Sequence, residues 1–209
     1  MAALNFPTQQ ASLSLTPSRW WRVALAFWAL TALVISGGLA SAHWYALPHP
    51  APVNPALVRA LASRSTAADG GRHTVTHVLY AECRCSQSIL EHLIARGARR
   101  DVAESSLLVS PTPELTQRLS AAGYRVDVVA AGELQTRFAI ESAPLLIVAD
   151  AAHAIRYMGG YTLHKQAPDI RDVDIIDDVL AGRDAPELPL FGCAVSQRLK
   201  KLLDPFGLR

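Results

Sequence analysis

Residues 76–86 read THVLYAECRCS. The part that ends at Tyr80 is rich in β-branched and aromatic residues, which is typical of a buried strand. Residues 86–95 have helical periodicity instead, with four apolar residues on one face: Ile89, Leu90, Leu93 and Ile94. Cys83 and Cys85 therefore lie where a predicted strand ends and a predicted helix begins.

Strands and helices alternate on both sides of this junction. The patterns predict strands at 74–80, 102–110, 124–130, 145–149 and 154–161, and helices at 86–95, 113–122, 132–140 and 169–182. Such alternation predicts the α/β class, with a largely parallel sheet that has helices on both faces and ends in an antiparallel hairpin. Asp169 is the predicted N-cap of the last of these helices, and Asn54-Pro55 predicts the start of a shorter one upstream.

The position of the two cysteines favours a reactive thiol. The N-terminus of a helix carries unpaired N–H groups and a partial positive charge, and both stabilise a thiolate. Arg84 acts in the same direction, whereas Glu82 opposes it. Two other interpretations stay open: Cys83 and Cys85 are buried structural cysteines, or they form half of a metal site whose second pair is absent.

Two segments carry a resemblance to a known superfamily. Residues 76–86 resemble the active-site segment of thioredoxin-like proteins, and residues 138–148, FAIESAPLLIV, resemble the helix, loop, cis-proline and strand that follow in that fold. The resemblance covers residues 74–181 and implies a thioredoxin-like fold, with a mixed central sheet flanked by helices. Within the superfamily the chain is similar to membrane-anchored RedB-type proteins, which combine a Cys-x-Cys motif with a late Phe-Gly-Cys, here residues 191–193.

The resemblance also implies roles for particular residues. Cys83 would be the attacking thiol of a thiol–disulfide oxidoreductase, and Cys85 the resolving thiol. Pro144 would be a cis-proline that faces them, and the backbone of Ala143 would pair with a substrate chain. Such chemistry needs no organic cofactor, and its partners would be protein thiols or disulfides.

The sequence departs from the family pattern in three ways. Glu82 stands where the family usually has tryptophan. No carboxylate is evident on the preceding strand, where His77 is either a proton carrier or a half-buried structural residue. The motif is also one residue short.

The short motif leaves the disulfide pairing open. Residues i and i+2 of an extended chain are ~6.6 Å apart, whereas a disulfide favours Cα atoms about 5.5–6 Å apart. A bond between Cys83 and Cys85 therefore needs a tightened turn. Alternatively Cys193 is the resolving partner, and Gly192 lets the chain turn before it.

Two other functions fit the same residues. The first is a copper or soft-metal chaperone that uses Cys83, Cys85 and either Cys193 or His164, because thiolates with one imidazole suit copper. The second is a redox-inert assembly module of thioredoxin-like fold.

Residues 23–42 contain no charged side chain. A helix of 20 residues spans ~30 Å, which is the thickness of the hydrocarbon core of a bilayer. Arg19 and Arg22 precede this segment, so the positive-inside rule places the N-terminus in the cytoplasm and the rest in the periplasm of a bacterial inner membrane. We expect an uncleaved single-pass anchor, although Ala40-Ser41-Ala42 has the form of a signal-peptidase site.

Five parts follow from these patterns. They are a short cytoplasmic tail (1–22), a transmembrane anchor (23–45), a proline-rich spacer with a short helix (46–72), a thioredoxin-like domain (73–185) and a cysteine-containing C-terminal tail (186–209). The chain has 20 Lys and Arg against 18 Asp and Glu, and two of the arginines precede the anchor. The part after the anchor is therefore electrically neutral, which argues against a nucleic-acid partner.

Overall fold

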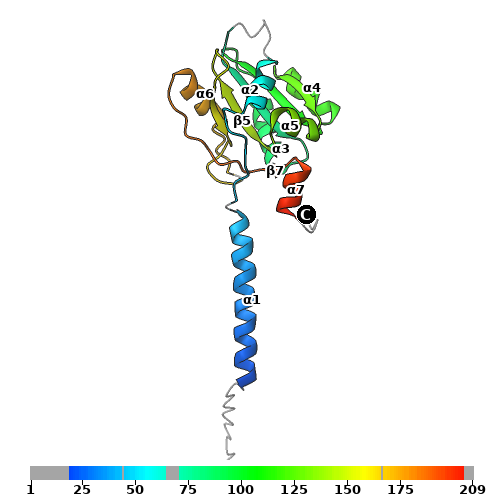
Figure 1. Ribbon diagram of the computed structural model, residues 1–209, viewed down its shortest axis with the longest axis vertical. Helices are drawn as coiled ribbons and strands as arrows, with labels where there is room; N and C mark the ends of the chain where they lie inside the picture. Colours follow the sequence, from blue (N-terminus) through cyan, green and yellow to red (C-terminus); the bar gives the residue numbers. More distant parts are fainter. Residues whose placement is uncertain (1–18, 44, 65–70, 166, 205–209) are drawn as a thin grey trace, which may run out of the picture. The chain divides into compact units, whose positions relative to one another are not determined.

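The computed structural model describes residues 19–43, 45–64, 71–165 and 167–204 (Figure 1). Most of the predicted cytoplasmic tail, residues 1–18, lies outside this described part. The chain divides into two compact units, residues 1–44 and 45–209, and each is described by itself.

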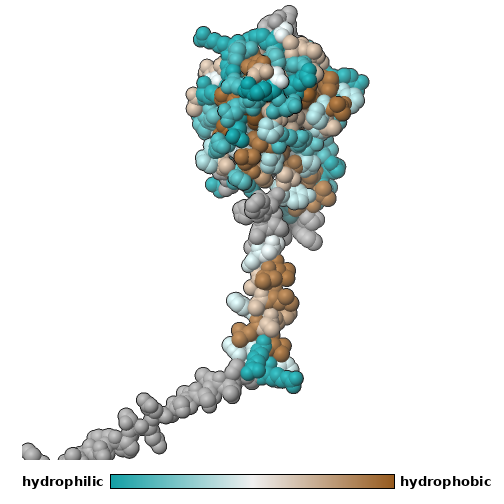
Figure 2. Space-filling model, turned by 90° about the vertical axis from the view of Figure 1, so that its left-hand side faces the viewer, coloured by the Kyte–Doolittle hydropathy of each residue, from teal (hydrophilic) through white to brown (hydrophobic). Residues whose placement is uncertain are grey.

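The first unit contains helix α1, Arg19–His43. Its residues 19–38 are long and apolar enough to cross a membrane, and none of the residues in the span is buried. Figure 2 shows hydrophobic side chains along this helix and hydrophilic ones at its N-terminal end. The predicted span, residues 23–42, lies within α1. Both an anchor and a signal sequence have this form, so the choice between them stays a prediction.

The second unit begins with a short segment and helix α2, Pro55–Ala62. The side chain of Asn54 accepts hydrogen bonds from the backbone N–H groups of Ala56 and Leu57, so the predicted N-cap is confirmed. The predicted spacer is not a free linker along its whole length. The N–H of Leu47 donates to the carbonyl of Leu190 at 2.8 Å, which ties the segment to the C-terminal part of the chain.

A five-stranded mixed sheet forms the centre of this unit, in the order β3-β2-β1-β5-β6. The strands are β1 (Thr74–Tyr80), β2 (Ala103–Val109), β3 (Arg125–Val129), β5 (Leu145–Ala149) and β6 (Ile155–Gly159). β1, β2 and β3 are parallel, whereas β5 is antiparallel to both β1 and β6. The expected mixed sheet and its closing antiparallel hairpin, β5 and β6, are therefore confirmed, and the parallel part is limited to β1, β2 and β3.

Helices cover both faces of the sheet, as predicted. They are α3 (Arg84–Arg96), α4 (Pro113–Ala121), α5 (Ala131–Phe138) and α6 (Asp172–Leu180), followed by the C-terminal α7 (Gln197–Leu203). Side chains alternate along β1, so Leu79 joins a core with α3, α4 and α6, and Val78 joins a second core with α2 and α5.

The last predicted helix begins later than expected. α6 starts at Asp172 and not after Asp169, because the N–H of Arg171 donates to the carbonyl of Tyr161, and that of Ile170 to Pro168. These bonds hold the residues before Asp172 in a loop conformation.

A second, two-stranded sheet joins distant parts of the chain. It pairs β4 (Ser142–Ala143) with β7 (Cys193–Ala194) in antiparallel register. Because β4 directly precedes Pro144 and β7 contains Cys193, this sheet brings two of the predicted site residues together.

Candidate thiol–disulfide site

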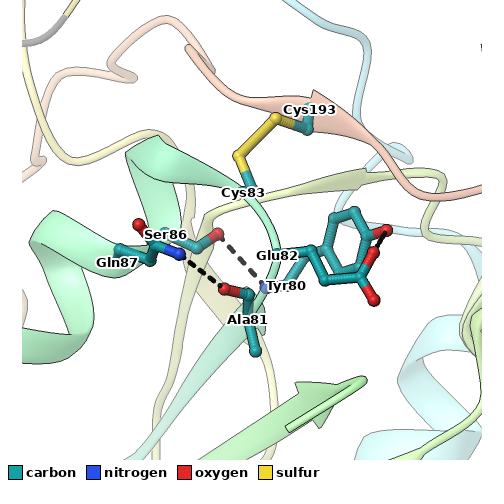
Figure 3. The surroundings of a disulfide bond; sticks show 7 residues. All are labelled: Tyr80, Ala81, Glu82, Cys83, Ser86, Gln87 and Cys193. Carbon is teal, nitrogen blue, oxygen red and sulfur yellow. Dashed lines mark hydrogen bonds between the residues drawn. A yellow bond between two sulfur atoms is a disulfide. The ribbon is translucent and has the colours of Figure 1, made fainter.

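Cys83 and Cys193 form a disulfide bond (Figure 3). Their Cα atoms are 6.0 Å apart, and 110 positions separate them in the sequence. Cys85 is a free, half-buried cysteine. Of the pairings that the sequence left open, the structure has the one between Cys83 and Cys193.

The turn between β1 and α3 positions Cys83. Its N–H donates to the carbonyl of Tyr80 at 3.0 Å, and its carbonyl accepts from the N–H of Gln87 at 2.9 Å. The Ser86 hydroxyl accepts from the N–H of Tyr80 at 3.1 Å, and the Gln87 side chain donates to the carbonyl of Ala81 at 3.2 Å (Figure 3). Cys83 is thereby fixed as the N-cap residue of α3.

The β4–β7 ladder positions Cys193. Its register places Cys193 opposite Ala143 and Ala194 opposite Ser142. Beyond the ladder, the N–H of Val195 donates to the carbonyl of Glu141 at 2.7 Å. A side chain at Gly192 would overlap the carbonyl of Ala143 and the ring of Pro144, so glycine allows the two strands to approach.

Pro144 follows a cis peptide bond with Ala143, as the resemblance implied. It lines a pocket of about 300 Å³ together with Cys85, Tyr161 and Phe191. Cys85 and Pro144 therefore border one cavity, and Phe191, two residues before Cys193, lies on its wall.

The thiol of Cys85 differs from an exposed thiol in its acidity. Burial raises the pKa of Cys85, and the positive charges of Lys165 and Arg84 offset this only in part. Its thiolate fraction at neutral pH is therefore smaller than that of an exposed cysteine.

His77 lies in a buried polar cluster. It is fully buried, and not half-buried as one of the sequence interpretations had it. Its Nδ1 atom lies 2.9 Å from the hydroxyl of Tyr161, and its Nε2 atom lies 3.3 Å from a carboxylate oxygen of Glu104. Tyr161 also lines the pocket, so the cluster reaches the cavity beside Cys85.

A buried carboxylate, Glu104, lies beside His77 on the neighbouring strand. It lies on β2 and not on β1, and Arg96 donates to it at 2.7 Å. Burial raises the pKa of Glu104, but hydrogen bonds from His77 and Arg96 outweigh burial and lower it to about 2. The only sequence signal was a single charged residue, the glutamate itself, in the strand predicted at 102–110.

Arg96 connects this carboxylate to a second one. Its guanidinium lies 3.1 Å from Asp172 at the start of α6, and His92 lies 2.9 Å from the same carboxylate. Both Asp172 and Glu104 have fully buried side chains, whereas His92 reaches the surface. The cluster joins α3, α6 and two strands beneath the site.

The residues of the copper hypothesis are placed as follows. His164 is exposed in the loop after Tyr161, where its carbonyl accepts from the hydroxyl of Thr162 at 2.8 Å. Within the described residues, no group of three or more His, Cys, Asp and Glu side chains is arranged to hold a metal ion. Copper binding by Cys83, Cys85 and His164 stays a prediction.

Comparison with solved structures finds several chains of similar fold, two of which are described here. No family model matches the chain, and no curated protein matches it. An uncharacterized conserved protein from Geobacillus kaustophilus has 17% identity and a TM-score of 0.46, over 60% of this chain and 77% of the other. A hypothetical protein from Sinorhizobium meliloti 1021 has 17% identity and a TM-score of 0.48, over 60% and 79%. Neither likeness bears on the function.

Proposed function

We propose that the chain is a membrane-anchored thiol–disulfide oxidoreductase of thioredoxin-like fold, and that Cys83 and Cys193 are its redox couple. One observation carries the proposal: a disulfide joins the strand-to-helix turn at Cys83 to a strand that pairs with the residue before Pro144. Two further features support a redox role over a purely stabilising one. One end of the bond, Cys83, lies at the N-terminus of α3, and the free thiol of Cys85 lines a cavity close by.

The reaction is an exchange of two electrons with a protein dithiol. In the oxidising direction, two partner thiols lose two protons and two electrons and form a disulfide. The Cys83–Cys193 bond breaks, and both of its sulfurs are protonated or remain as thiolates. The reverse reaction uses the same atoms, so no cofactor enters either direction.

The proposed location follows from α1. This helix would hold the chain in a bacterial inner membrane, with Arg19 and Arg22 on the cytoplasmic side. Residues 45–209 would then lie in the periplasm, where disulfides persist. The partners would be protein thiols or disulfides on that side of the membrane.

The test uses the full chain, purified in detergent and oxidised. It is mixed with a peptide that carries two thiols, and free cysteines are counted by maleimide labelling and intact mass. We expect one labelled cysteine per chain before the reaction and three after it, with the peptide oxidised in equal amount. Retention of one labelled cysteine under excess peptide would contradict the proposal.

Three serine variants provide the controls. Cys83→Ser and Cys193→Ser each remove the couple, so neither variant should oxidise the peptide stoichiometrically. Cys85→Ser keeps the couple and should oxidise the peptide as the unsubstituted chain does. Equal activity in all three variants would show that the oxidant is elsewhere.

A further inference from the structure

The two cysteines of the disulfide differ in their exposure to solvent. Cys83 is 1% exposed, whereas Cys193 and its neighbours Phe191, Gly192 and Ala194 are all partly exposed. An external thiolate must reach a sulfur before it can exchange, so this difference bears on which sulfur reacts.

The chain around each cysteine agrees with this difference. Backbone hydrogen bonds join the N–H of Cys83 to the carbonyl of Tyr80 and the carbonyl of Cys83 to the N–H of Gln87, so the turn between β1 and α3 is tightly held around it. Cys193 lies instead in a two-residue strand whose own residues are partly exposed.

The leaving sulfur is also better placed on Cys83. Cys83 is the N-cap of α3, a helix of 13 residues, and no side chain caps the first turn. The partial positive charge of the helix N-terminus stabilises a thiolate there. This partial charge favours the departure of Cys83 as a thiolate when the bond breaks.

Cys193 remains near the site after the bond opens. Leu190 and Val195, on either side of its strand, are each 1% exposed and belong to the core. The carbonyl of Leu190 accepts a backbone hydrogen bond from the N–H of Leu47, and the N–H of Val195 donates one to the carbonyl of Glu141. The strand is therefore fixed at both ends, and its middle residues can meet a partner without release of the C-terminal segment.

We infer that Cys193 is the sulfur that exchanges with the partner and that Cys83 is the buried resolving cysteine. This assignment is the reverse of the roles that the resemblance implied, and it rests on the proposed function. A partner thiolate attacks Cys193, a partner–Cys193 disulfide forms, and Cys83 leaves as a thiolate. The second partner thiol then attacks the partner sulfur of this mixed disulfide, and Cys193 leaves as a thiolate.

The first experiment locates the mixed disulfide. The full-length Cys85→Ser chain, oxidised and in detergent, contains only two cysteines, Cys83 and Cys193. It is mixed with excess N-acetylcysteine, quenched in acid at successive times, digested with pepsin at low pH and mapped by mass. We expect the early adduct on the peptide that contains Cys193. An early adduct on Cys83 would overturn the inference and leave the proposed function intact, whereas a bond that never opens would overturn both.

A second experiment measures each sulfur alone. In the Cys85→Ser background, each of the variants Cys83→Ser and Cys193→Ser retains one cysteine. Serine is similar in size to the cysteine it replaces, so the surroundings of the remaining cysteine stay the same. The reduced chains are mixed with the disulfide of N-acetylcysteine. We expect the chain that retains Cys193 to form its mixed disulfide at least about tenfold faster, because access limits the buried thiol. A faster reaction of the chain that retains Cys83 would contradict the assignment.

Discussion

Ala143 and Cys193 are antiparallel partners in the β4–β7 ladder, so the residue before the cis-proline holds the backbone of the cysteine that is bonded to Cys83. The resemblance led us to expect that the backbone of Ala143 would pair with a substrate chain. In the structure it pairs instead with β7 of the same chain. The strand that carries the disulfide partner of Cys83 is therefore part of the proposed site itself.

Gly192 is predicted to be essential for this pairing. In Gly192→Ala, the new methyl group would overlap the carbonyl of Ala143, so we expect the β4–β7 ladder to separate. The free energy of unfolding should fall by about 1–3 kcal/mol, and the yield of the Cys83–Cys193 bond should drop after oxidation. Urea unfolding and maleimide counting measure the two effects.

Gly132→Ala is the matched control for this substitution. Gly132 lies in α5, and a methyl group there would meet nothing within 4 Å. Alanine is also favoured over glycine within a helix by up to ~1 kcal/mol, so stability should hold or rise. Equal losses in the two variants would show that the fit of Gly192 against β4 is unimportant.

Glu104 is predicted to be important for folding. Glu104→Gln leaves Arg96 without one of its two buried carboxylates and weakens the contact with His77. Removal of one partner from a buried pair costs about 3–5 kcal/mol, and Asp172 keeps this loss near the lower value. The control is Glu91→Gln, which breaks an exposed pair with Arg118 and should change urea unfolding little.

The lowered pKa of Glu104 also leads us to predict a loss of stability in acid. Its pKa is about 2 in the folded chain, against 4.5 ordinarily, so the unfolded chain takes up the proton first as the pH falls. The stabilisation is complete above pH 4.5 and is lost as the pH falls towards 2. The free energy of unfolding, measured with urea across this pH range, should decline by a few kcal/mol, and the decline should be smaller in Glu104→Gln. An equal dependence on pH in the two chains would contradict the pairing of Glu104 with Arg96 and His77.

Cys85 is predicted to react slowly with alkylating reagents. Burial raises the pKa of Cys85, so in the oxidised chain its iodoacetamide rate at neutral pH should lie below that of N-acetylcysteine. As the pH rises, the rate for Cys85 should reach its plateau at a higher pH than the rate for N-acetylcysteine does. Arg84→Gln removes one of the offsetting charges and should slow the reaction further. A rate at neutral pH above that of N-acetylcysteine would contradict this picture.

Local patterns were enough to predict the order of the helices and main-sheet strands from β1 to α6. Runs of apolar residues predicted strands such as Leu145–Ala149, and Asn54-Pro55 predicted the start of α2. These features depend on neighbouring residues, so the sequence alone contains them. The direction of β5 depends instead on which strand it joins, so local patterns predicted its antiparallel hairpin with β6 but not its antiparallel pairing with β1.

Features that depend on distant residues were not predicted. β4 and β7 are two residues long and exist only because they pair with each other, so neither has a periodicity to detect. The disulfide pairing depends on that ladder and was left open for the same reason. The contact between His77 and Glu104 joins two strands, and neither residue indicates the other in the sequence.

The position of the disulfide in the chain has a consequence for limited proteolysis. The covalent ring from Cys83 to Cys193 contains β2, β3, β5 and β6, and of the five strands in the main sheet only the central β1 lies outside it. A protease that cuts any loop within the ring leaves both fragments linked. The nicked chain would migrate as one species on a non-reducing gel and as two after reduction, so protease sensitivity would be visible only once the redox couple has been opened.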